Sequence, residues 1–139
     1  MISPVDEVAI ESMRMYGYYL GMAFQIVDDV LDFTGEQAEI GKPVGSDLLQ
    51  GLITLPSIYY AESHPDDPDV TCLENGCYSE QVRMERLVQT IRKSDGVSRS
   101  LDEATEYIDK AVGILEMMPD TIERKALEEI ARYTVSRKS

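Results

Sequence analysis

Apolar residues recur at intervals of three and four positions along most of the chain, which is the spacing of helices. The longest run is predicted to start at Ser3-Pro4, where serine suits a helix cap and proline the first position, and to continue to about Phe33. Its apolar residues cover more than one face, as in a helix buried among others: Val8, Ile10, Met13, Tyr16, Leu20, Phe24, Val27, Val30 and Leu31. No strand-like alternation of useful length occurs, so we predict an all-α fold for residues 1–139.

Glycines, prolines and capping residues divide the middle of the chain. In chain order they predict a break over 34–46, a second helix from Leu48 that is kinked or interrupted at Pro56, a loop with only short structure over 62–78, and a helix from Ser79 to Asp95-Gly96. The last of these has an apolar stripe of Met84, Leu87, Val88 and Ile91.

Two more helices are predicted towards the C-terminal end. Ser100 with Glu103 forms a capping box, and the helix that follows ends at Pro119. Asp120 with Glu123 repeats the start signal for a last helix. The residues of that helix predicted to face inward are Ile122, Ala126, Ile130 and Tyr133.

The charge balance narrows the choice of partners. Acidic residues outnumber basic residues by 26 to 13, and the formal net charge at pH 7 is −13. This charge repels nucleic acid and anionic membrane surfaces, so neither is an expected partner. The charged N-terminal stretch is unlike a signal peptide, and no apolar run is long enough to span a bilayer. We expect a soluble, cytoplasmic protein.

Three carboxylates lie in the last turns of the predicted first helix. Asp32 follows Asp28 by four positions and Asp29 by three, so the three side chains can converge. Their repulsion, and their place at the negative end of the helix dipole, each cost roughly a few tenths of a kcal/mol or more. A cation would reverse both penalties, and hard oxygen ligands without His or Cys suit Mg²⁺. The alternative is a solvated acidic face, the usual fate of a charge cluster.

Two glycines share a helix line with one of these aspartates. Gly17, Gly21, Gln25 and Asp29 follow one another at four-residue spacing. Each glycine is less favourable than alanine by about 1 kcal/mol in a helix interior, and it clears space beside the helix. The line therefore indicates either a groove that leads to the carboxylates or a close contact with another helix.

An ordered set of segments accompanies the aspartates. It consists of Gly21-Met22-Ala23-Phe24-Gln25-Ile26-Val27-Asp28-Asp29-Val30-Leu31-Asp32, Gly41-Lys42-Pro43-Val44-Gly45-Ser46-Asp47-Leu48, Gly51-Leu52-Ile53-Thr54-Leu55-Pro56, Ala104 to Ala111, and Ala131 to Arg137. The set resembles the second aspartate-rich motif, the Gly-Lys-Pro and Thr-Leu-Pro segments and the closing helices of trans-isoprenyl diphosphate synthases, the polyprenyl synthetases. The resemblance covers nearly the whole chain and implies the C-terminal part of the isoprenoid synthase helical bundle.

The resemblance implies a prenyltransferase of isoprenoid biosynthesis. In that family, Mg²⁺ holds an allylic diphosphate between two facing aspartate-rich helices, the diphosphate leaves, and isopentenyl diphosphate attacks the resulting allylic cation and loses a proton. The implied substrates are thus allylic diphosphate and isopentenyl diphosphate. The implied roles are magnesium ligation by Asp28, Asp29 and Asp32, contact with the allylic diphosphate by Lys42, and a place beside the condensing substrates for Phe24 and Gln25.

Some implied roles have plainer alternatives. Lys42 could only screen an acidic loop, and Phe24 could belong to the core. Gln25 needs a polar partner, which could be backbone. Many family members have lysine at the position of Leu52, and its replacement leaves Lys42 as the only base between residues 15 and 82. This variation favours medium- or long-chain products.

The resemblance also implies that part of the enzyme is missing. Family members carry the first aspartate-rich motif, and the arginines that bind isopentenyl diphosphate, in an N-terminal half that this sequence does not contain. We therefore expect a fragment that is inactive alone and that forms a homodimer through the full-length enzyme. One alternative is a noncatalytic helical partner subunit of a heteromeric prenyltransferase, and another is a scaffold whose carboxylates bind nothing.

Overall fold

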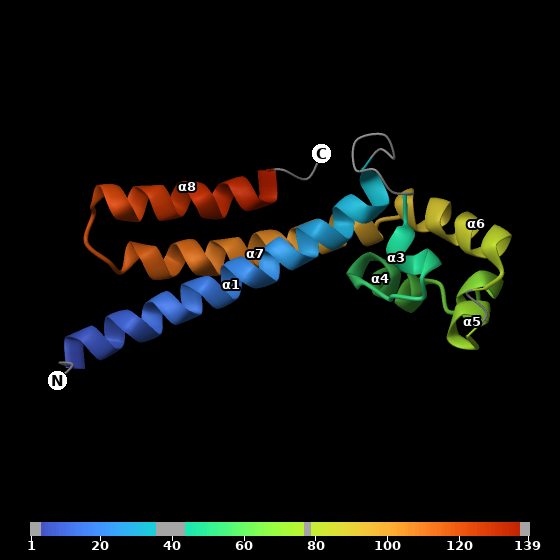
Figure 1. Ribbon diagram of the computed structural model, residues 1–139, viewed down its shortest axis with the longest axis horizontal. Coiled ribbons are helices and arrows are strands. Elements are labelled where there is room, and N and C mark those ends of the chain that lie inside the picture. The colour runs from blue at the N-terminus through green and yellow to red at the C-terminus, as the bar shows by residue number, and fades with distance from the viewer. Residues whose placement is uncertain (1–3, 36–43, 77–78, 137–139) are drawn as a thin grey trace. The chain divides into compact units, whose positions relative to one another are not determined.

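The computed structural model describes residues 4–35, 44–76 and 79–136, and all of its regular structure is helical (Figure 1). The helices are α1 (Pro4–Thr34), α3 (Ser46–Leu49), α4 (Leu55–Ser63), α5 (Pro68–Glu74), α6 (Gln81–Arg92), α7 (Gly96–Glu116) and α8 (Ile122–Ser136). The predicted all-α class is confirmed. The chain divides into two compact units, one of residues up to Val27 and from Asp102 onward, the other of Asp28–Leu101. Helices α1 and α7 each contribute to both units.

The first unit contains most of α1 and α7 together with α8. Its buried apolar residues come from all three helices: Tyr16, Ala23, Ile26, Val27, Ala104, Ile108, Ala111, Val112, Leu115 and Ala131. The Tyr16 hydroxyl donates a hydrogen bond of 2.8 Å to the backbone carbonyl of Leu127, which joins α1 to α8. The multi-sided apolar pattern of the first predicted helix is thus explained in part by α7 and α8.

The second unit is built around α6, which contacts α3, α4 and α5. Its core consists of Phe33, Leu48, Tyr60, Val70, Met84, Leu87, Val88 and Ile91. The predicted stripe of Met84, Leu87, Val88 and Ile91 is therefore confirmed, since each of these side chains is at most 2% exposed.

The segment predicted as a loop over 62–78 contains a helix. Asp67 caps α5, and its carboxylate accepts a hydrogen bond of 2.8 Å from the backbone N–H of Asp69. Pro68 occupies the first turn, where its missing N–H costs nothing. The prediction of a loop with only short structure is confirmed, since α5 has 7 residues, and Asp67-Pro68 is its start signal.

The second predicted helix is interrupted, as expected, since α3 ends at Leu49 and α4 begins at Leu55 with Pro56 in its first turn. Two other boundaries differ from the prediction. Helix α7 begins at Gly96 instead of Ser100. Ser100 lies inside the helix, where its hydroxyl donates a hydrogen bond of 2.7 Å to the backbone carbonyl of Gly96. At the start of α8, Thr121 accepts a hydrogen bond from the N–H of Arg124 through its hydroxyl, so the cap lies one residue after the predicted Asp120.

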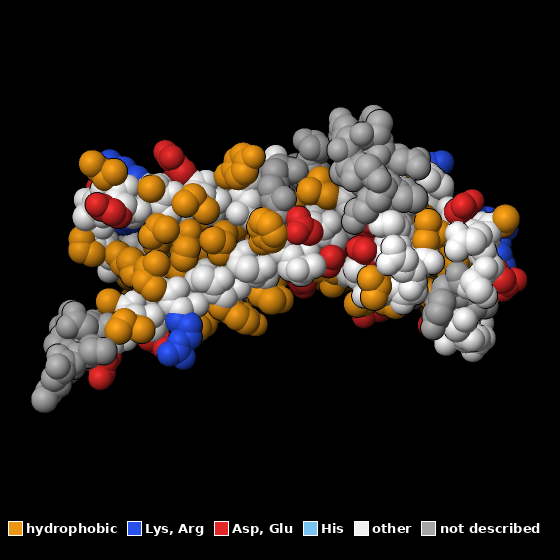
Figure 2. Space-filling view, in the orientation of Figure 1, with side chains coloured by type: hydrophobic (Ala, Val, Ile, Leu, Met, Phe, Trp, Pro, Cys, Tyr) orange, Lys and Arg blue, Asp and Glu red, His pale blue; other side chains and the backbone are white. Residues whose placement is uncertain are grey.

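The inward face predicted for α8 was also wrong. Ile122, Ile130 and Tyr133 are 82%, 52% and 68% exposed, and the buried residues are Ala131 and Thr134. The apolar residues of α8 do follow helical spacing, but the smaller residues beside them, Ala131 and Thr134, are the ones buried within the first unit. Figure 2 shows apolar side chains gathered over the helices of this unit. Among the described helices, none combines the length and apolar character that crossing a bilayer requires.

Candidate functional site

The three predicted carboxylates lie in the last two turns of α1, in the second unit. Asp28 and Asp29 are half-buried, whereas Asp32 is 3% exposed. The last turn of α1 contains no basic residue. Three negative charges at the negative end of a helix dipole therefore have no cation on the same turn to offset them.

Asp32 differs from the other two in its contacts. The Ser46 hydroxyl donates a hydrogen bond of 2.9 Å to its Oδ1, and the backbone N–H of Asp47 donates one of 3.2 Å to its Oδ2. The backbone N–H of Gly45 donates a further bond of 2.7 Å to the carbonyl of Asp32. These bonds join the end of α1 to the start of α3.

Asp28 and Asp29 are the more accessible of the three carboxylates. Within residues 4–35, 44–76 and 79–136, no group of three or more His, Cys, Asp or Glu side chains is arranged to hold a metal ion. A complete three-carboxylate site on α1 is therefore absent from the described part. The donor chemistry of Asp28 and Asp29 still suits Mg²⁺, which commonly binds one or two carboxylates and completes its shell with water and substrate phosphate.

Phe24 and Gln25 lie on α1 in the first unit, and both are exposed. Phe24 is 49% exposed, so it is not a core residue among the described elements. It lines a hollow of about 770 Å³ between α1 and α8. The other residues of this hollow are Leu20, Ala126, Glu129, Ile130, Tyr133 and Thr134. The exposed face of α8 thus forms one wall of the space beside Phe24.

The remaining family-like segments are only partly described. Lys42, predicted to contact the allylic diphosphate, lies outside the described residues. Leu52, which stands where many family members have lysine, is 54% exposed. Thr54 precedes α4 as its N-cap residue, yet its hydroxyl makes no capping hydrogen bond.

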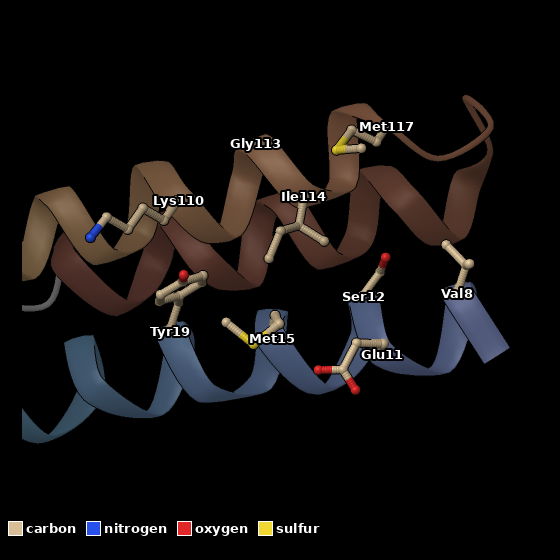
Figure 3. Close-up of a pocket in the computed structure, with 9 residues that line it drawn as sticks. All are labelled: Val8, Glu11, Ser12, Met15, Tyr19, Lys110, Gly113, Ile114 and Met117. Carbon is tan, nitrogen blue, oxygen red and sulfur yellow. The ribbon is translucent and has the colours of Figure 1, made fainter.

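A second hollow lies between α1 and α7 in the first unit (Figure 3). It has a volume of about 500 Å³ and is lined by Val8, Glu11, Ser12, Met15, Tyr19, Lys110, Gly113, Ile114 and Met117. Met15 and Ile114 point into it from the two helices. The ammonium of Lys110 lies 5.7 Å from the ring centroid of Tyr19, so a cation borders a largely apolar surface. Sequence periodicity did not predict this hollow, because it depends on how α1 and α7 pair.

A polar network in the second unit was also missed. Asp69 on α5 is 5% exposed and accepts hydrogen bonds from Arg83 and Arg86 on α6. Nearby, the Tyr60 hydroxyl donates a short hydrogen bond of 2.5 Å to the Asp67 carboxylate. Burial and that hydrogen bond raise the pKa of Tyr60 to about 12. The sequence signal for this network was the pair Arg83 and Arg86, three positions apart on one helix face. Their partner Asp69 lies on a short helix within the segment predicted as loop.

Comparison with known proteins shows what this arrangement is similar to. Residues 1–93 match the family described as polyprenyl synthetase. Heptaprenyl diphosphate synthase component 2 of Bacillus subtilis is 39% identical over 136 residues, which are 98% of this chain and 38% of that protein.

Solved structures agree with the sequence match. The crystal structure of heptaprenyl diphosphate synthase from Staphylococcus aureus superposes with a TM-score of 0.90 and 37% identity, over 96% of this chain and 42% of that one. A polyprenyl synthase from Caulobacter crescentus, crystallised with calcium and isoprenyl diphosphate, gives a TM-score of 0.79 and 36% identity over 93% of this chain and 40% of that one. The chain spans about two fifths of the length of these relatives.

Proposed function

Because the chain belongs to the polyprenyl synthetase family, we propose that it supplies the second metal- and diphosphate-binding motif of a prenyltransferase. The observation that carries this proposal is the pair of adjacent, half-buried carboxylates, Asp28 and Asp29, at the end of α1. The proposed reaction joins isopentenyl diphosphate to an allylic diphosphate.

The chemistry of the donors supports a divalent cation at this position. Carboxylate oxygens are the ligands that Mg²⁺ and Ca²⁺ prefer, and Asp28 and Asp29 supply them near the end of α1. The Caulobacter crescentus relative was crystallised with calcium and isoprenyl diphosphate, which is consistent with a cation and diphosphate site in this family. We propose Mg²⁺ as the cofactor, held by Asp28 and Asp29 and completed by ligands from outside the described residues.

The proposed roles follow the charge changes of the reaction. The allylic C–O bond breaks and leaves negative charge on the diphosphate, while the double bond of isopentenyl diphosphate attacks the allylic carbon and a proton is then lost. Bound Mg²⁺ would neutralise the charge on the departing diphosphate. Asp28 and Asp29 orient the diphosphate through the cation, and Lys42 adds a direct positive charge. Phe24 and Gln25 lie beside the condensing substrates.

We further propose medium- or long-chain products. Leu52 offers no charge to a second diphosphate contact, and its side chain is exposed. The names of the Bacillus subtilis and Staphylococcus aureus relatives specify heptaprenyl diphosphate, a product of this class. A cytoplasmic location and a homodimer formed through the full-length enzyme stay predictions.

Titration calorimetry with Mg²⁺ and pyrophosphate tests the metal site. The chain should bind weakly, and Asp28→Asn or Asp29→Asn should remove the binding. Asp109→Asn, on the exposed middle of α7, is the matched control and should bind like the parent. Equal binding by the Asp28 and Asp29 variants, or none by the parent, would contradict the assignment.

A second candidate function is that of a partner subunit without catalytic activity of its own. The observation that favours it is the name of the Bacillus subtilis relative, which is called a component of its synthase. In this alternative, the chain lends its aspartates to an active site on another polypeptide. Copurification with the product of a neighbouring gene, followed by an elongation assay of the complex, would distinguish the two candidates.

A further inference from the structure

We propose that Asp32 is a positioning residue that clasps the end of α1 to the start of α3, and that it does not ligate the metal ion. The clasp itself rests on hydrogen bonds and burial in the second unit. Only its contrast with Asp28 and Asp29 rests on the function proposed above. In sequence, the three aspartates of the motif are equivalent candidates, and the fold separates them.

The hydrogen bonds of Asp32 occupy both of its carboxylate oxygens. Oδ1 accepts a hydrogen bond of 2.9 Å from the Ser46 hydroxyl, and Oδ2 accepts one of 3.2 Å from the backbone N–H of Asp47. A carboxylate oxygen has more than one lone pair, so these bonds alone do not exclude a metal ion. They do compensate the desolvation of a buried charge, which a structural aspartate requires.

Burial makes the distinction sharper. Asp32 is 3% exposed, and Ser46, its hydrogen-bond donor, is 5% exposed. Mg²⁺ keeps several waters in its shell and needs open space beside its protein ligands. The side chains of Asp28 and Asp29 are half-buried and remain partly accessible to solvent, whereas that of Asp32 is almost fully enclosed.

The clasp is also fixed from the side of α6. Gly45 has a φ of 73°, in the left-handed region, and a Cβ at this position would collide with the Val88 side chain. The backbone N–H of Gly45 donates a hydrogen bond of 2.7 Å to the backbone carbonyl of Asp32. Gly45 therefore lies between the end of α1 and the Val88 side chain of the core of the second unit.

This arrangement gives Asp32 a task in the site. Asp28 and Asp29 add negative charge to the negative end of a helix, which favours fraying of the last turn. Hydrogen bonds from Ser46, Asp47 and Gly45 hold that turn in place from outside the helix. Asp32 thus orients the two ligands without touching the ion.

Urea unfolding in EDTA, with and without later addition of Mg²⁺ and pyrophosphate, tests the proposal on the whole chain. In EDTA, Asp32→Asn should raise the unfolding equilibrium constant by about tenfold to a hundredfold, since it loses a charge-assisted hydrogen bond in a buried site. Asp28→Asn should change it far less, because that side chain is half-buried. With Mg²⁺ and pyrophosphate, Asp32→Asn should retain a reduced shift of the urea midpoint, because its two ligands are present but less well oriented, and Asp28→Asn should lose the shift.

A double-mutant cycle with Ser46→Ala supplies the residue-specific control. The effects of Asp32→Ala and Ser46→Ala should be strongly non-additive, because each removes the same hydrogen bond. If Asp32→Ala does not fold, Ser46→Ala with the aspartate intact still reports on the clasp. Asp32→Asn keeps an acceptor for the Ser46 hydroxyl, so its urea midpoint should lie between those of the parent and Asp32→Ala.

Two results would overturn the proposal. One is an Asp32→Asn variant that is as stable as the parent in EDTA, which would show that the clasp does not stabilise the fold. The other is a folded Asp32→Asn variant that loses the metal-dependent shift as Asp28→Asn does, which would make Asp32 a ligand. If the parent itself shows no metal-dependent shift, the proposed function fails, and the EDTA comparison alone decides the clasp.

Discussion

The Arg86 guanidinium donates two hydrogen bonds to the carboxylate of Asp69, of 2.7 and 2.6 Å, and so joins α6 to α5. Arg83, one turn earlier, donates another of 3.1 Å. The hydrogen bond from Arg86 is the main cause that holds the pKa of the Asp69 carboxyl below its ordinary value, and burial of the carboxyl opposes it. Both arginines are more exposed than their partner, so the two sides of this network are not equivalent.

That asymmetry predicts unequal mutational effects. Asp69→Asn should lower the free energy of unfolding by about 1 to 2 kcal/mol, because the exposed arginines regain water. Removing the arginines together, as Arg83→Gln with Arg86→Gln, should be more destabilising, since a buried carboxylate then stays unpaired. Urea unfolding at pH 7 would measure both, with Asp66→Asn as an exposed control. A less destabilised arginine variant would contradict this account.

The same network predicts a dependence on acid. A carboxyl whose folded pKa lies below its unfolded value of about 3.9 contributes stability above that pH. The contribution is lost as the pH falls from about 4 through the folded pKa. The difference in unfolding free energy between parent and Asp69→Asn should therefore shrink below pH 4. A difference that is unchanged at pH 3 would argue that the ion pair is not its source.

Tyr60 provides a prediction at high pH. Burial first, and then its hydrogen bond to Asp67, raise the pKa of Tyr60 to about 12. A phenol with a raised folded pKa contributes stability that is complete below the unfolded value of about 10 and is lost as the pH rises towards 12. Ultraviolet titration should show one phenol fewer ionising near pH 12 in Tyr60→Phe than in the parent. An unchanged titration curve would contradict the assignment.

Lys42 is tested best in a full-length enzyme that carries this part. If Lys42 contacts the allylic diphosphate, Lys42→Ala should lower kcat/KM for that substrate by about tenfold to more than a hundredfold, the effect of one charged hydrogen bond. The value for isopentenyl diphosphate should change less. Equal kcat/KM values in parent and variant would leave Lys42 as a solvated residue.

This chain alone should show no prenyltransferase activity. A diphosphate brings about three negative charges, which two or three aspartates and one lysine cannot balance without several metal ions and further bases. Radiolabelled isopentenyl diphosphate with an allylic primer and Mg²⁺ should yield no extractable polyprenyl product. Adding the separately expressed N-terminal part of a relative should restore some. Elongation by the chain alone would show that the aspartate-rich motif of this chain suffices without the first one.

Exposed apolar side chains of the first unit predict self-association of the isolated chain. Phe24, Ile130 and Tyr133 are each at least 49% exposed and border one hollow. Patches of this kind rarely stay uncovered in solution. Sedimentation should show concentration-dependent oligomers that Ile130→Gln with Tyr133→Gln reduces. Met117→Gln with Ile122→Gln, at exposed positions outside this hollow, is the control and should leave the oligomers unchanged.

The sequence alone was enough for the helical class, the family and the position of the carboxylates. Helices are set by contacts between residues three and four positions apart, so the stripe of Met84, Leu87, Val88 and Ile91 could be read directly and is buried. The aspartates likewise lie at the end of a long helix, as their spacing and neighbours predicted.

Only the tertiary structure decided which residues of a pattern pack and which stay open. On α8, Ala131 is buried while Ile130 and Tyr133 are exposed, because packing depends on the neighbour and not on apolarity alone. In the aspartate motif, the chain returns at Gly45 to Asp47 and buries Asp32, leaving Asp28 and Asp29 partly open. Helical periodicity places all three carboxylates near one another, but a partner fourteen positions away in sequence determines the environment of Asp32.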